Sequence, residues 1–173
     1  MRLFSIVEGV RPISDVVPKQ REQQKKFKEL VQNAAQRDTK ALQLLKNATN
    51  AGYIRTLLKK AKSQLIEIQR MKSTETKIAT LREALSRILS ALKRFFAVEL
   101  CAGAEGNECI TAREEIAQAA LNVEVALKII CGSKQIRDQI DEVFNKHLNP
   151  PTSNLQSKVW NIGDEILVFT RQC

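Results

Sequence analysis

The chain has 173 residues, 43% of them hydrophobic and 27% charged, and a formal net charge of +9. This composition is typical of one globular domain with its own core, and it excludes disorder along the whole length. No apolar run reaches the roughly 18 residues of a membrane-spanning helix. We expect no signal peptide at the N-terminus. The compartment stays open, with an intracellular protein favoured.

The charge is divided unevenly along the chain. Residues 1–100 contain 21 Lys and Arg against 9 Asp and Glu, whereas residues 101–173 contain 7 against 10. Such an asymmetry between halves suggests that the basic half meets an anionic partner, which would be a nucleic acid, a membrane surface or an acidic protein.

Apolar residues at helical spacing predict three helices in the basic half, over about 14–50, 53–72 and 75–100. Residues 19–29 are polar and basic, so the first helix is expected to project beyond the core at this end. The third helix has the clearest pattern, with apolar residues at alternating spacings of three and four. They are Ile78, Leu81, Leu85, Ile88, Leu92 and Phe95.

Three further elements follow in the acidic half. Thr111 opens a Thr-Ala-Arg-Glu capping box, which predicts a fourth helix that ends at Gly132. A fifth helix begins after Ser133 and ends before Asn149-Pro150-Pro151. The remaining residues return to helical spacing, but 164–171 are left open between a helix and a short strand.

Short connections between these helices favour antiparallel neighbours. We therefore predict an all-α fold: an elongated up-and-down helical bundle of four main helices plus one or two shorter C-terminal helices. One domain covers residues 1–173. Within it, residues 1–14 are interpreted as a segment that docks on a partner, and residues 149–173 as a C-terminal appendage.

The four cysteines are Cys101, Cys109, Cys131 and Cys173, and the chain has one histidine, His147. Without a Cys-x-x-Cys pair, the sequence predicts no metal site. Reduced thiols are the favoured interpretation. The alternative is a disulfide between Cys101 and Cys109, which bracket a glycine-containing loop and would then indicate an oxidising compartment.

No motif for catalysis or cofactor binding is found. The chain has no nucleophile elbow and no glycine-rich phosphate loop. His147 precedes the Pro-Pro break and is interpreted as a surface histidine, and Glu114-Glu115 as acidic residues of a helix N-terminus. We therefore predict a protein that is not an enzyme and has no cofactor.

Basic residues cluster on each of the first three predicted helices, where they can form a shared positive field. The first hypothesis is that this field binds the phosphate backbone of nucleic acid, as in a nucleoprotein or coat-type subunit of a homo-oligomer or larger assembly. The candidate binding residues are Lys25, Lys26, Lys28, Arg55, Lys59, Lys60, Lys62, Lys93 and Arg94.

Two alternatives remain open. The segment 85–96 is basic and amphipathic and ends in Phe95-Phe96, so it can lie on an anionic membrane surface. Its apolar spacing fits the core of a bundle better, with Leu85 and Ile88 buried and Phe96 more exposed than Phe95. The other alternative is an adaptor for an acidic protein.

Overall fold

The computed structural model describes the backbone of residues 13–148 and 154–173, and the side chains of residues 20–148 and 154–173. Within this part of the chain, six α-helices and two short 3-10 turns form an all-helical structure, which confirms the predicted fold class. The helices are α1 (Ile13–Leu44), α2 (Gly52–Ile68), α3 (Thr74–Ala97), α4 (Gly106–Ile130), α5 (Lys134–Leu148) and α6 (Leu155–Phe169). The 3-10 turns are η1 (Gly103–Glu105) and η2 (Thr170–Gln172).

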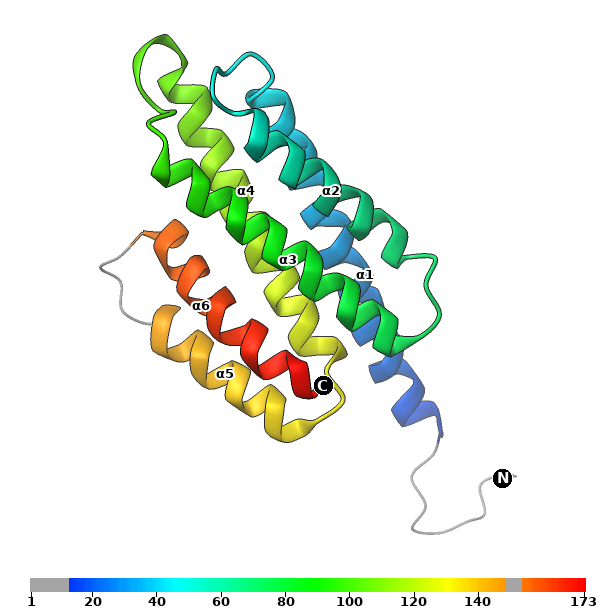
Figure 1. Cartoon of the computed structure of the whole chain (residues 1–173). Helices are drawn as coiled ribbons and strands as arrows, with labels where there is room; N and C mark the ends of the chain where they lie inside the picture. The colour runs from blue at the N-terminus through cyan, green and yellow to red at the C-terminus, as the bar shows by residue number, and fades with distance from the viewer. Residues whose placement is uncertain (1–12, 149–153) are drawn as a thin grey trace, which may run out of the picture.

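The first four helices pack around a common core, and the last two form a hairpin on one side of it (Figure 1). α1 packs against α2 and α4, and α3 packs against the same two helices. α6 lies on α3 and α4 and runs in the same direction as α4, while α5 packs mainly on α6. The N-terminal turns of α1 extend past the ends of the other helices.

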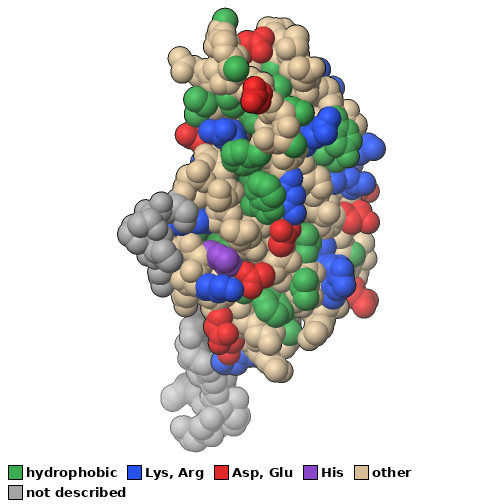
Figure 2. Space-filling model, turned by 60° about the vertical axis from the view of Figure 1, so that its left-hand side comes forward, with side chains coloured by type: hydrophobic (Ala, Val, Ile, Leu, Met, Phe, Trp, Pro, Cys, Tyr) green, Lys and Arg blue, Asp and Glu red, His purple; other side chains and the backbone are tan. Residues whose placement is uncertain are grey.

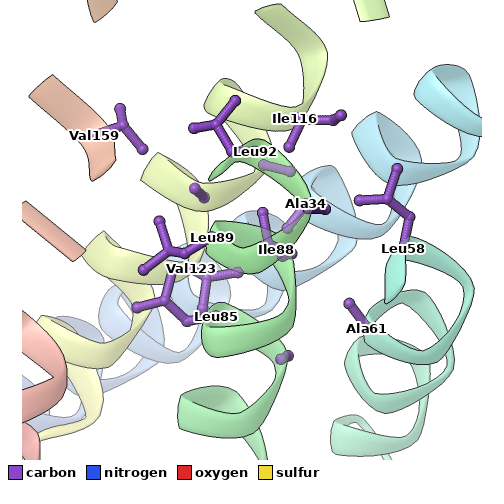
Figure 3. Packing of buried hydrophobic residues seen from close by; sticks show 14 of the residues in the cluster. Ala34, Leu58, Ala61, Leu85, Ile88, Leu89, Leu92, Ile116, Val123 and Val159 are labelled. Atoms are coloured by element: carbon purple, nitrogen blue, oxygen red, sulfur yellow. The ribbon is translucent and has the colours of Figure 1, made fainter. Parts of the chain in front are cut away.

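The core is centred on α3, where Leu85, Ile88 and Leu92 are fully buried. Figure 3 shows these side chains among residues of the neighbouring helices, with Val123 from α4 beside Leu85. The predicted burial of Leu85 and Ile88 is confirmed. Phe95 is also buried, at 2% exposure, and Phe96 is 41% exposed, as its place at the edge of the stripe predicts.

Helix ends are fixed by local polar contacts. Asn50 takes a left-handed φ of 66° between α1 and α2. The Arg55 guanidinium donates to the carbonyl oxygens of Leu45 (2.9 Å) and Ala48 (3.2 Å), in the turn that follows α1. The capping box at Thr111 is wrong, because α4 already begins at Gly106. The Thr111 hydroxyl instead donates to the carbonyl of Asn107 within the helix (3.0 Å).

Two disulfides fasten the C-terminal half. One joins Cys101 to Cys109 around the start of α4, and the other joins Cys131, at the end of α4, to Cys173. All four cysteines are thereby paired, which differs from the expected reduced thiols. The second pair forms because α4 and α6 run side by side in the same direction, so that their C-terminal ends meet.

The α6 helix is tightly seated on α3. Gly163 lies so close that a Cβ atom there would stand 2.4 Å from Leu89 Cδ1. Arg82 of α3 donates to the hydroxyl of Thr170 (3.0 Å) and the carbonyl of Leu167 (2.7 Å). The region left open between helix and strand is therefore α6 followed by η2.

The proposed docking segment at residues 1–14 lies largely outside the described residues, and none of its side chains is described. None of the helices in the described part of the chain is both long and apolar enough to cross a lipid bilayer.

Candidate anion-binding surface

The N-terminal part of α1 carries the first basic cluster. Lys25, Lys26 and Lys28 are exposed, and Phe27 between them packs against the core. The Lys77 ammonium at the start of α3 stands 6.0 Å from the centre of the Phe27 ring. The α2–α3 connection, with Arg70 and Lys72, therefore lies at the same end of the bundle. We call this set the basic pole: Lys25, Lys26, Lys28, Arg70, Lys72 and Lys77.

The second cluster lies further along the bundle. Arg55 of α2 contacts the carbonyl oxygen of Leu45, just after α1, and the charge of Lys62 of α2 acts on Asp38 of α1. Because Lys59 and Lys60 fall between Arg55 and Lys62 in α2, they lie alongside the last two turns of α1. Asp38 is ten residues from Lys28 in α1, which is roughly 15 Å along the helix axis. The first two clusters are thus neighbours along α1 and α2, but they form two separate patches.

The third cluster is at the opposite end, and its two residues face different helices. The Lys93 ammonium forms an ion pair with Asp164 of α6 (2.9 Å), whereas Arg94 lies 5.9 Å from the Tyr53 ring of α2. The structure therefore does not join the nine predicted residues into one patch.

The nine residues also differ in what they already bind. Arg55 holds the end of α1, Lys93 is paired, and Lys62 is half-buried beside Asp38. In the described part of the chain, no ion-pair partner is found for the exposed ammonium groups of the other lysines on α1 and α2. These are Lys25, Lys26, Lys28, Lys59 and Lys60. They are the cations that remain available to a partner.

A second surface feature was not predicted. Phe96 of α3 stacks on Trp160 of α6, with ring centres 6.0 Å apart, and the Arg113 guanidinium lies 5.0 Å from the Phe96 ring. Lys93 lies 5.4 Å from the Trp160 ring. We call these four residues the aromatic–cation patch. Figure 2 shows hydrophobic and basic side chains side by side on the face where α5 and α6 lie.

Three carboxylates in the bundle interior were also missed. Glu115 is 6% exposed and pairs with Arg37 (3.1 Å) and Lys40 (3.3 Å) of α1. Its interpretation as part of a helix N-terminus is wrong, because α4 starts nine residues earlier. Glu115 instead joins α4 to α1.

Asp38 and Glu124 are fully buried, and no hydrogen-bond partner of either carboxyl group is found among the described residues. Burial raises the pKa of both groups well above the ordinary value. The charge of Lys62 partly opposes the increase in the pKa of Asp38, while Asp164 raises the pKa of Glu124 further. Both sites therefore favour the protonated, neutral acid.

The single histidine joins the two helices of the C-terminal hairpin. His147 of α5 is half-buried and contacts the Glu165 carboxylate of α6, which Lys146 also approaches, at 3.7 Å. In Figure 2 the histidine lies beside acidic and basic side chains. This cluster fastens α5 to α6.

Comparisons with protein-family models, with curated proteins and with solved structures find no match for this chain.

Proposed function

We propose that this protein is a non-enzymatic helical binding protein whose basic pole and neighbouring α2 lysines hold an anionic polymer. The phosphate backbone of nucleic acid is the first candidate. The observation that carries the proposal is the set of exposed ammonium groups on α1 and α2 that lack ion-pair partners among the described residues.

The spacing of these groups favours a polymer over a single small anion. The basic pole and the Lys59–Lys60 pair are separated by roughly 15 Å or more along the bundle. Duplex DNA carries one charge per roughly 1.7 Å of its axis, so a duplex that lies along α1 and α2 meets both groups at once. In this proposal α1–α4 are the main helices of an elongated up-and-down bundle, and several copies coat the polymer.

The disulfides bear on where this happens. Two disulfides favour an oxidising compartment over the intracellular one that the sequence suggested. We infer a partner met outside the reducing cytosol, such as packaged or extracellular nucleic acid.

The test compares two variants that lose the same net charge. In the first, Lys25, Lys26, Lys59 and Lys60 are all changed to Gln. In the control, the four substituted lysines lie on α4–α6: Lys128, Lys134, Lys146 and Lys158. We expect the first variant to bind duplex DNA more weakly. The slope of the logarithm of the binding constant against the logarithm of the salt concentration should also become smaller, by up to about 0.9 per lost phosphate contact. Equal weakening in both variants would show a net-charge effect and contradict the proposed site.

An anionic membrane surface is the second candidate, and the aromatic–cation patch is the observation that favours it. The apolar stripe of α3 is buried, so on this face of the molecule Phe96 and Trp160 are the aromatic side chains that we expect to contact a membrane. We expect Phe96→Ser to leave duplex binding within a few-fold of wild type, because phosphate contacts are made by charge. The wild-type chain could instead sediment with anionic vesicles and the Phe96→Ser variant, with its helicity preserved, could fail to do so. That result would make a membrane surface the first candidate for the partner and nucleic acid the second.

A further inference from the structure

A cavity of about 750 Å³ opens at the basic pole. It lies between the projecting part of α1, the ends of α2 and α4, and the start of α3. Five apolar side chains line it: Phe27 and Val31 of α1, Ile68 of α2, and Ile129 and Ile130 of α4. Phe27, Ile129 and Ile130 are only half-buried, so part of their apolar surface faces the cavity. A volume of this size is typical of sites for small molecules.

The cavity follows from a change along the inner face of α1. At three- and four-residue spacings, Val31 and Phe27 are followed toward the N-terminus by Gln24 and Gln20, which also line the cavity. Along the inner face of α1, apolar side chains thus give way to glutamine amides at the point where the helix extends beyond the bundle. The part of the cavity nearest the bundle is therefore apolar, and its outer part is lined by amide groups that can form hydrogen bonds.

The charge around the cavity has one sign. Lys28 and Lys77 line it, and the described lining residues include no Asp or Glu. The position of Lys77 over the Phe27 ring keeps one ammonium group at the wall. A ligand that matches this site needs an apolar body and a single anionic group, because charge-assisted hydrogen bonds to Lys suit a carboxylate.

We propose that this cavity binds a long-chain fatty acid. The alkyl chain lies against Phe27, Ile68, Ile129 and Ile130, and the carboxylate accepts hydrogen bonds from Lys28 and Lys77. The cavity shares Lys28 and Lys77 with the basic pole. The test of polymer binding substitutes only Lys25, Lys26, Lys59 and Lys60, so the two proposals can fail separately.

The probe is myristate, measured by its displacement of a fluorescent fatty acid from the full chain. We expect saturable binding that weakens at least tenfold in the Lys28→Gln, Lys77→Gln double variant. The matched control is Lys59→Gln, Lys60→Gln, which loses the same charge away from the cavity and should bind as wild type. Gln24→Glu, an exposed helical substitution that adds a like charge at the mouth, should also weaken binding, with helicity unchanged.

Three results would overturn the proposal. They are the absence of saturable myristate binding to the wild-type chain, equal weakening in both double variants, and displacement by myristyl alcohol as effective as by myristate. Duplex binding by the wild-type chain, measured beside myristate binding, separates the two proposals. A chain that binds DNA but not myristate retains the proposed function and loses only this inference.

Discussion

Cationic side chains have different surroundings in the two halves of the molecule. On α4–α6 most of them have partners within the chain: Lys128 with Asp141, Lys134 with Asp138, Lys146 with Glu165, Arg113 with Phe96, and Arg137 with the Cys131 carbonyl. On α1 and α2 five exposed lysines have none among the described residues: Lys25, Lys26, Lys28, Lys59 and Lys60. Surface ion pairs contribute only about 0–1 kcal/mol. These five lysines therefore contribute little to the stability of the fold, unlike Arg37 and Lys40, which pair with the buried Glu115.

The two halves are also fastened differently. The α1–α3 part has no disulfide and depends on apolar stripes, whereas both disulfides lie in the part from Cys101 to Cys173. α5 and α6 have 15 residues each, against 32 for α1 and 24 for α3. Short helices bury less apolar surface, so a covalent link there supplies what packing does not.

The largest effect is expected in the apolar stripe. Leu85→Ala leaves a cavity at a fully buried site and should lower the free energy of unfolding by about 2–5 kcal/mol. Urea unfolding followed by circular dichroism measures it. A loss below roughly 0.5 kcal/mol, as at a surface position, would show that α3 is not the centre of the core.

Removing the disulfides one at a time tests the covalent contribution. The Cys131–Cys173 pair is separated by 42 residues and the Cys101–Cys109 pair by 8. Loop-closure entropy then predicts losses of about 4 and about 2.5 kcal/mol for the two double Cys→Ser variants. Hydrogen exchange should accelerate mainly in α5 and α6 when the longer link is removed. Equal acceleration in α1 would mean that both halves unfold as one unit.

The seat of α6 is tested by Gly163→Ala. Its new methyl group would collide with the buried side chain of Leu89, so we expect a loss of about 1–3 kcal/mol. Gly132→Ala is the matched control, because a Cβ at that position meets nothing within 4 Å. Similar thermal stability of the two variants would contradict the close approach of α6 to α3.

The buried carboxyl of Glu124 predicts a pH dependence. Burial raises the pKa of Glu124 in the folded chain, so the native state holds a proton that the unfolded chain releases near its ordinary pKa. Stability should fall as the pH rises above that ordinary value, by up to about 1.4 kcal/mol per pH unit. Glu124→Gln should flatten this slope, and the exposed Glu142→Gln should not. Denaturant midpoints between pH 4 and 8 decide between these outcomes.

The smallest effects separate free cations from structural ones. Lys60→Gln should leave stability within about 0.5 kcal/mol of wild type. Arg37→Gln removes one of two partners of the buried Glu115 and should cost about 1 kcal/mol. If the two substitutions cost the same, the distinction between unpaired and paired cations does not hold.

The periodic part of the fold could be predicted from the sequence. The α3 stripe from Ile78 to Phe95 is buried because a 3.6-residue period fixes one face of a helix without knowledge of its neighbours. The same stripes place Asp38 beside Ala34 and Ala41, and Glu124 beside Ala120 and Leu127. A carboxylate at a core position of its helix is the sequence signal for both buried acids.

Features that join distant helices could not be predicted in this way. Phe96 and Trp160 meet only because α6 lies on α3, and Cys131 meets Cys173 only because α6 runs alongside α4. The capping box failed for the opposite reason. Thr111 and Glu114 have the right local spacing, but the helix had already begun at Gly106.

The link between Cys131 and Cys173 also determines how force passes through the molecule. A pull applied at residue 173 crosses the sulfur–sulfur bond directly to the end of α4, so the chain between the two cysteines carries no tension. α5 and α6 would stay folded or unfold unloaded while α4 is drawn away from α1 and α3. Stretched from its two ends, the oxidised chain should therefore extend by the full length of its contour minus the two loops closed by the disulfides, and a reductant should restore the missing length.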